Sequence, residues 1–201
     1  MKERNSLTTY LIIVICGFYF TAQYYPNILH LSLPLQQELF LIKSAYFPDG
    51  QLHGVDHGEY WRLITVALTH GSITHLLFNM LAFWQLGNII EKIYGKAKYS
   101  AILLGSLLAG SAASYFFNPT NVPAVGASGM IFGLFAAMLV TSRKYGIDYK
   151  NVVGVIVLNL LITFLVPNID WHAHVGGLVG GAIATYLVRG LNGPKQRLRN
   201  I

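Results

Sequence analysis

Apolar residues occur along this chain in six long runs that polar connections separate. The runs cover about residues 7–25, 63–90, 99–117, 127–142, 152–167 and 172–189. A helix needs about 20 apolar residues to cross the ~30 Å hydrocarbon core of a membrane, and several runs approach that length. The pattern therefore predicts an all-α membrane protein, in which residues 1–201 form a single transmembrane domain of six helices.

The connection between the first two runs, residues 25–62, is much longer than an ordinary loop. It carries turn signals at Pro26, Pro34 and Pro48-Asp49-Gly50 around the amphipathic stretch Leu33–Tyr46. We expect an outer loop whose short helices rest at the membrane interface. The fourth and fifth runs are the shortest, so we expect one end of each to begin below the membrane surface.

The composition also indicates a membrane protein. Hydrophobic residues make up 54% and charged residues 11% of the chain, and the mean hydropathy is +0.49. Soluble domains average about 25% charged residues. The single cysteine, Cys16, excludes an intramolecular disulfide. Charged residues 1–5 precede the first run as in a signal peptide, but no small-residue cleavage site follows, so we expect a retained helix.

The positive charges are distributed unevenly between the two sides of the predicted bundle. The net charge is +6, yet the cations lie in the connections and form no basic patch, which argues against nucleic acid. Of the 14 Lys and Arg residues, all but Lys43 and Arg62 lie on the side of the termini. The positive-inside rule therefore predicts cytoplasmic termini. All seven histidines fall on the other side, so we expect a site that faces outward, and the compact form favours a bacterial plasma membrane.

A serine between glycines begins the fourth run, in the sequence Gly126-Ala127-Ser128-Gly129. A serine at the first turn of a helix lies beside unsatisfied backbone N–H groups and the positive end of the helix dipole. Those donors suit a developing oxyanion. Alternatively, Ser128 is only an N-cap, and Gly129 and Gly133 form a face that packs against another helix.

A histidine stands at the outer start of the sixth run, where His174 is followed by Gly177 and Gly181. This glycine face lets a neighbouring helix approach closely. If that helix is the fourth run, Ser128 and His174 meet at the same depth, and the histidine can act as general base for the serine. Alternatively, His174 is an interfacial residue or a hydrogen-bonding partner in the core.

A third polar group enters the second run, where His75 and Asn79 share one helix face at spacing i, i+4. Both side chains can donate hydrogen bonds to a negative oxygen, each typically worth ~2.7–4 kcal/mol in a transition state. Alternatively, they form a polar pair that holds helices together, at about 0.6 kcal/mol per bond. The two interpretations are compatible.

Taken in order, these motifs resemble the signature of the rhomboid family of intramembrane serine proteases. The matching set is Trp61-Arg62, His75-x-x-x-Asn79, Gly126-Ala127-Ser128-Gly129 and Ala173-His174-x-x-Gly177-x-x-x-Gly181. The resemblance covers nearly the whole chain and implies a six-helix rhomboid-like bundle. It implies a Ser128–His174 dyad without an acidic third member, and an oxyanion site from His75, Asn79 and the Ser128 backbone N–H. It implies no cofactor and no metal.

The resemblance also implies roles for residues around the site. His70 and Glu91 match structural polar positions, and the Trp-Arg pair would belong to an outer loop that braces the protein in the bilayer. The family often has tyrosine four residues after the serine; Phe132 retains the ring here, so we expect it to pack on the histidine. Asp170 could suggest a triad, but we expect it to cap the sixth run.

The function implied is cleavage of transmembrane segments of other membrane proteins, with access past the fifth run. Three alternatives compete with it. A non-catalytic rhomboid-like protein would bind membrane helices, but this chain keeps both the serine and the histidine. A metal enzyme would need ligands at metal spacing, and only Asp56 lies near His53 and His57, in a loop that we expect to be solvated. A transporter would show inverted repeats and charges near mid-membrane, and the sequence has neither.

Overall fold

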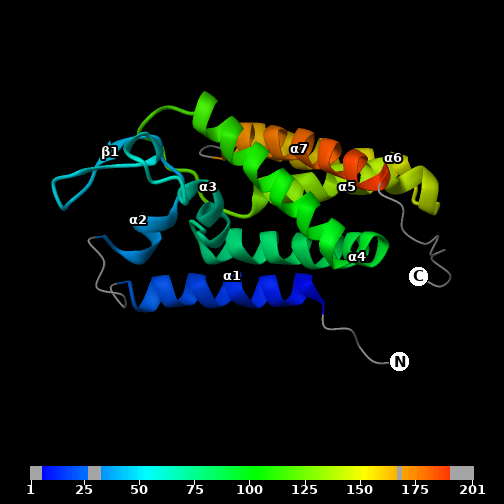
Figure 1. Ribbon diagram of the computed structural model, residues 1–201, viewed down its shortest axis with the longest axis horizontal. Coiled ribbons are helices and arrows are strands. Elements are labelled where there is room, and N and C mark those ends of the chain that lie inside the picture. The colour runs from blue at the N-terminus through cyan, green and yellow to red at the C-terminus, as the bar shows by residue number, and fades with distance from the viewer. Residues whose placement is uncertain (1–5, 27–32, 167–168, 191–201) are drawn as a thin grey trace.

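A computed structural model describes residues 6–26, 33–166 and 169–190. Its elements are α1 (Leu7–Tyr24), α2 (Leu35–Leu39), β1 (Ala45–Tyr46), β2 (Leu52–His53), the 3-10 turn η1 (Val55–His57), α3 (Arg62–Thr65), the 3-10 turn η2 (Val66–Leu68), α4 (Ile73–Phe117), α5 (Ser128–Tyr145), α6 (Tyr149–Leu165) and α7 (Trp171–Gly190). The long helices lie side by side, and the short elements gather at one end of them (Figure 1). The predictions that concern His30, Lys2, Arg4, Lys195, Arg197, Arg199 and the run end at position 167 lie outside the described residues.

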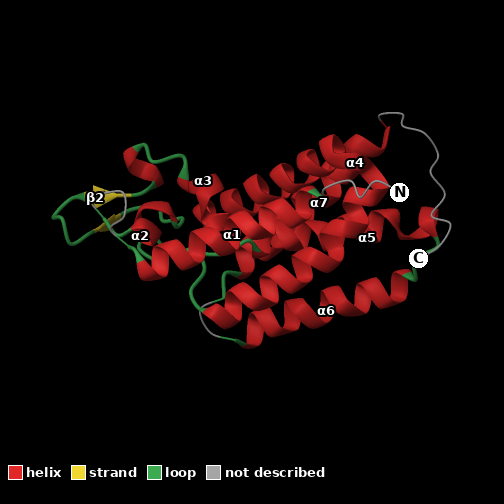
Figure 2. Ribbon diagram, turned by 90° about the horizontal axis from the view of Figure 1, so that it is seen from below, coloured by secondary structure: helices red, strands yellow, loops and turns green. Residues whose placement is uncertain are grey.

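Helices α4, α5 and α7 form the packed centre of the bundle, with α1 against α4. Helix α6 contacts α5 and α7 and lies along one edge of the bundle (Figure 2). Glycines allow the close approach of α5 and α7, because a Cβ on Gly177 or Gly181 would collide with the backbone of Gly129 or Gly133. The two glycine faces therefore meet at backbone contact, as their spacing predicted.

The second apolar run differs from the helix expected over 63–90. The long helix begins only at Ile73, where Ser72 has extended backbone and its hydroxyl accepts the N–H of His75. The residues before that cap form α3 and η2, which bury Val66 and Ala67 in the core. The predicted start of this helix, at residue 63, was wrong. An apolar run indicates which residues are buried, but the position of the N-cap decides where the helix begins.

The second and third runs are continuous through the expected connection at 91–98. Helical structure extends to the end of α4 at Phe117, interrupted only at Gly95, whose φ of 72° and ψ of 163° are non-helical. The halves 73–94 and 96–117 fold back on each other about this residue (Figure 1). A left-handed φ is readily adopted by glycine, so one residue replaces the loop that the charges of this segment suggested.

The ends of the remaining helices lie within a few residues of the expected ones. Asp148 caps α6 by accepting the N–H of Lys150, and Gly146 ends α5 with a φ of 70°. By length and composition, α1 and α4 are the two described helices that could cross a membrane, and Ser128–Ser142 and Tyr149–Leu165 are shorter apolar helices. The number of spans therefore stays a prediction.

Helix α1 is attached to α4 through Glu91. Its carboxylate accepts hydrogen bonds from the hydroxyl of Ser6, from the backbone N–H groups of Leu7 and Thr8, and from the Thr8 hydroxyl. The buried Tyr99 hydroxyl adds a bond to the same threonine. A carboxylate at a helix N-terminus satisfies orphan donors and complements the helix dipole. Glu91 thus has the structural role that the resemblance implied.

The described part of the outer connection folds around Arg62, whose side chain is fully buried. Its guanidinium donates to the backbone carbonyls of Gln37 and Phe40 and to Glu59, at 2.6–2.9 Å. His53 bridges Glu59 and Asp49 at 2.7 and 2.9 Å. Of the three residues expected to be solvated, Asp56 and His57 are exposed, whereas His53 is half-buried in this ion-pair network.

Candidate active site

The serine and histidine singled out by the sequence lie against each other. Ser128 is the first residue of α5, and the N-cap position is Ala127, which makes no side-chain capping bond. The Ser128 hydroxyl oxygen lies 2.8 Å from Nε2 of His174. Ser128 therefore is not the N-cap, and its side chain is directed to a residue 46 positions away in the sequence.

Three side chains hold the imidazole of His174, which is almost fully buried. The ring of Phe132 stacks on it, with 4.2 Å between centroids and 14° between planes. The hydroxyl oxygen of Thr163 in α6 lies 2.8 Å from Nδ1. Ser128 occupies the remaining nitrogen. Phe132 thus takes the packing position expected of it, whereas no pattern in the sequence indicated Thr163.

Asp170 lies at the start of α7 without contacting the imidazole of His174. One carboxylate oxygen of Asp170 accepts a hydrogen bond from the backbone N–H of Ala173 at 3.0 Å. The backbone carbonyl of Asp170 accepts a hydrogen bond from the backbone N–H of His174. This is the geometry of a helix cap. The structure therefore gives Asp170 the capping role predicted from its position, and Thr163, not a carboxylate, contacts the second nitrogen of His174.

His75 and Asn79 lie in the first turns of α4, beside the loop that leads into Ser128. A Cβ added to Gly126, whose φ is 112°, would lie 2.8 Å from Cε1 of His75 and 3.7 Å from Nδ2 of Asn79. The Asn79 amide donates one bond to the His75 backbone carbonyl at 3.1 Å. An amide nitrogen has two hydrogens, so one hydrogen remains for a ligand. Gly126 thus allows the imidazole to pack against the loop backbone.

A cleft of about 1170 Å³ joins these groups. It is lined by both halves of α4, by α5 and α6, by the start of α7 and by loop residues 123–126, and its walls are mainly apolar. Ser128, His174, His75 and Asn79 all line it, so the four candidate residues share one cavity. Ligand sites typically occupy 300–1,000 Å³, and this cleft is at least as large.

Comparison with known proteins assigns the chain to a family. The Rhomboid domain model matches residues 57–191, which is more than half of the chain. This chain belongs to the rhomboid family. Rhomboids are integral membrane proteins, and the long apolar helices described above fit that class.

Three relatives illustrate the likeness of this rhomboid to other members. Rhomboid protease GluP of Bacillus subtilis is 41% identical over 135 residues, which are 65% of this chain and 26% of GluP. YdcA of the same species is 36% identical over 139 residues, 67% of this chain and 70% of YdcA. RHOMBOID-like protein 5 of Arabidopsis thaliana is 36% identical over 135 residues, which are 63% of this chain and 43% of that protein. The matched region thus spans about a quarter of GluP.

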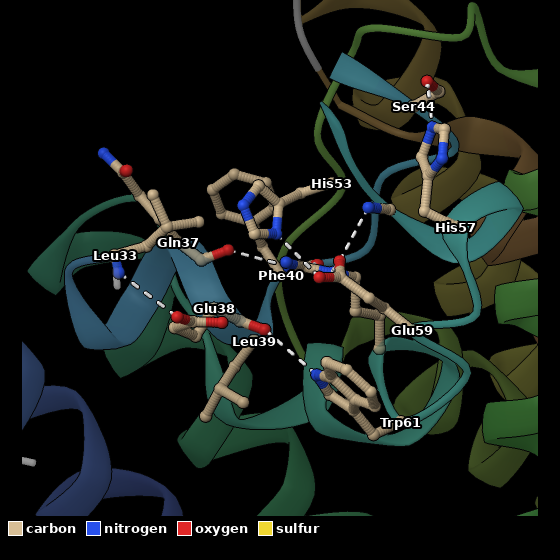
Figure 3. A network of polar contacts seen from close by, with 12 residues as sticks. Leu33, Gln37, Glu38, Leu39, Phe40, Ser44, His53, His57, Glu59 and Trp61 are labelled. Carbon is tan, nitrogen blue, oxygen red and sulfur yellow. Dashed lines mark hydrogen bonds and ion pairs between the residues drawn. The ribbon is translucent and has the colours of Figure 1, made fainter. Parts of the chain in front are cut away.

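Two further positions singled out by the resemblance lie outside the cleft of this rhomboid. His70 is buried, and its ring centroid lies 5.1 Å from that of His75 and 6.4 Å from that of Tyr19. Trp61 lies in the outer segment, the described residues 33–62 between α1 and η2, and its Nε1 donates a hydrogen bond to the backbone carbonyl of Glu38 (Figure 3). Within the described ranges, no group of three His, Cys, Asp or Glu side chains has the geometry of a metal site.

Proposed function

We propose that this rhomboid is an intramembrane serine endopeptidase that cleaves transmembrane segments of other membrane proteins. The observation that carries the proposal is the 2.8 Å separation between the Ser128 hydroxyl and Nε2 of His174 at the wall of a large apolar cleft. A serine is a weak nucleophile until a base within hydrogen-bond reach takes its proton. That arrangement supports a catalytic dyad of Ser128 and His174.

The chemistry follows from the groups around the serine. His174 takes the hydroxyl proton as Ser128 attacks a peptide carbonyl, and the same proton then goes to the leaving amine. The resulting acyl-enzyme is hydrolysed by water. Donors for the oxyanion are the His75 imidazole, the second amide hydrogen of Asn79 and the Ser128 backbone N–H, which has no partner within the first turn of α5.

The cleft supports a transmembrane segment as substrate. The first half of α4 and α6 both line the cleft, and these two helices make little contact with each other. A substrate helix would enter between them from the lipid. It must unwind locally, because backbone groups in a helix are satisfied internally and its carbonyls are hidden. We place both termini in the cytoplasm and the site on the outer side, as the distribution of cations indicates.

A second candidate is a non-catalytic rhomboid that binds a membrane helix in the same cleft. The apolar walls would suit such a ligand. That function requires no hydrogen bond between a serine and a histidine, so the Ser128–His174 contact favours the protease.

Substitution of the serine tests the protease. The protein would be reconstituted in liposomes with a fluorogenic substrate built on a transmembrane segment, next to its Ser128→Ala and Ser44→Ala variants. We expect cleavage by the parent and by Ser44→Ala, whose hydroxyl lies in the outer segment against His57, and none by Ser128→Ala. Equal cleavage by all three would remove Ser128 from the mechanism. If the parent neither cleaves nor reacts with a fluorophosphonate at Ser128, the helix-binding function stands instead.

A further inference from the structure

The imidazole of His174 has a second hydrogen-bonding partner that the dyad mechanism leaves unused. The hydroxyl oxygen of Thr163 lies 2.8 Å from Nδ1, and both side chains are buried. The two residues belong to different helices, since Thr163 lies in α6 and His174 in α7. This contact between helices gives the buried Nδ1 atom of His174 a hydrogen-bonding partner, and buried polar atoms are costly without one.

The hydrogens in this contact can be assigned from the neighbouring bonds. The Thr163 hydroxyl lies 2.9 Å from the backbone carbonyl of Asn159, which can only accept, and a hydroxyl has one hydrogen. If that hydrogen goes to the carbonyl, the oxygen of Thr163 is left to accept, and Nδ1 of His174 must carry a hydrogen. Nε2 is then unprotonated and accepts the hydroxyl hydrogen of Ser128, which is the state a general base needs.

The opposite arrangement would disable the dyad. If Nδ1 accepted the Thr163 hydrogen, Nε2 of the neutral ring would carry a hydrogen and donate it to Ser128. The imidazole could not then take the serine proton without first changing its tautomer. The bond to Asn159 therefore distinguishes a productive tautomer of His174 from an unproductive one.

We propose that Thr163 is the positioning residue of the Ser128–His174 dyad, accepting the Nδ1 hydrogen of His174 and so leaving Nε2 free for the serine proton. The proposal rests on the protease function proposed above. Thr163 takes the place that a carboxylate occupies in a serine triad, where the third group orients the histidine. As a neutral acceptor, the hydroxyl orients the ring without placing a charge in an apolar site.

The location of Thr163 links the base to the wall of the cleft. Thr163 and Asn159 both line the cleft from α6, the helix that a substrate would pass. Only Ile156 and Thr163 of α6 are buried. A displacement of α6 away from α7 therefore breaks the hydrogen bond between Thr163 and His174. Helix α6 must then return to this position before His174 can activate the serine.

Three variants test the proposal in liposomes with the substrate named above. Thr163→Val keeps the shape and removes the hydroxyl, Thr163→Ser restores the hydroxyl, and Thr185→Val is a matched control. Thr185 is also buried and bonded to the carbonyl four residues before it, but it lies far along α7 from His174. We expect Thr163→Val to lower kcat by roughly 10- to 100-fold with KM nearly unchanged, the loss typical of a hydrogen bond to a charged group. Thr163→Ser and Thr185→Val should keep most of the parent kcat.

A spectroscopic measurement gives an answer that does not depend on activity. In protein labelled with nitrogen-15 histidine, the His174 resonances are identified by their loss in His174→Gln. We expect protonated Nδ1 and unprotonated Nε2 in the parent and in Thr163→Ser, and a mixture of tautomers in Thr163→Val. Unprotonated Nδ1 in the parent, or an unchanged tautomer and kcat in Thr163→Val, would overturn the proposal. A parent that cleaves nothing would remove the protease function, and the tautomers alone would then decide on Thr163.

Discussion

At the scale of single residues, the candidate site depends on the lack of a side chain at Gly126. The imidazole of His75 packs where a side chain at position 126 would lie, and the φ of 112° at Gly126 is one that other residues rarely adopt. The loop that leads into Ser128 can therefore approach the proposed oxyanion donors only if position 126 is glycine. The Gly-x-Ser-Gly sequence thus has one glycine for backbone conformation and another for helix packing.

Gly126→Ala should consequently reduce activity more than it reduces stability. The new Cβ strains the backbone and displaces His75, and a shift of about 1 Å in a catalytic group can cost about 100-fold in rate. We expect kcat to fall by about that factor while the protein remains folded. Gly17→Ala is the control, because a Cβ at position 17 meets nothing within 4 Å. Equal kcat values for the two variants would contradict this role of Gly126.

At the scale of helices, the contact between α5 and α7 sets the relative position of Ser128 and His174. Gly177 and Gly181 allow backbone contact with Gly129 and Gly133, so the two helices meet at a depth fixed by four residues without side chains. A larger residue in such an interface forces off-rotamer side chains and backbone shifts, which typically cost 1–3 kcal/mol. The glycine face is thus a structural cause of the dyad geometry.

We therefore expect Gly181→Ala to lower both stability and activity, although position 181 is two turns from His174. The new methyl group meets the backbone of Gly133, which cannot move aside as a side chain can. Thermal unfolding in detergent should show a Tm several degrees below that of the parent. Gly154→Ala on α6 meets nothing within 4 Å and should leave Tm unchanged or raise it slightly. A Gly181→Ala protein as stable as Gly154→Ala would show that the helices can separate freely.

Sequence patterns predicted this level of organisation unevenly. Apolar runs and glycine spacing anticipated the long helices and the approach of Ser128 to His174, because both follow from periodicity along one segment. The single-residue reversal at Gly95 and the late start of α4 at Ile73 depend on one φ angle and one cap. Thr163 could not be found, since a threonine in an apolar run looks the same in sequence whether or not its hydroxyl also contacts a histidine on another helix.

At the scale of the whole molecule, the outer segment, residues 33–62, is held together internally by ion pairs among Asp49, His53, Glu59 and Arg62. The hydrogen bond to Glu59, aided by Asp49, raises the pKa of His53 above its usual 6.5 despite partial burial. Burial would raise the pKa of Glu59, but hydrogen bonds from His53, Arg62 and the Gly54 N–H hold it below 4.5. Both groups are therefore charged together at mildly acidic pH.

The signs of these shifts predict how stability depends on pH. The contribution of His53 is complete below pH 6.5 and is lost as pH rises through its raised pKa. The contribution of Glu59 is complete above pH 4.5 and is lost as pH falls through its lowered pKa. We expect Tm to decline above pH 6.5 in the parent and to decline less in His53→Gln. Parallel Tm profiles for the two proteins would show that the ion pairs do not stabilise the fold.

The attachment of α1 through Glu91 determines the axial position of this helix relative to α4. An apolar helix on an apolar neighbour can slide along its axis at little cost, because lipid and side chains offer similar surroundings. Four donors at the start of α1 meet one carboxylate of α4, so only one axial register satisfies them all. If α1 crosses a bilayer, as its length and composition allow, its depth is fixed by a protein partner, and a change in bilayer thickness would tilt or shift α1 and α4 as a pair.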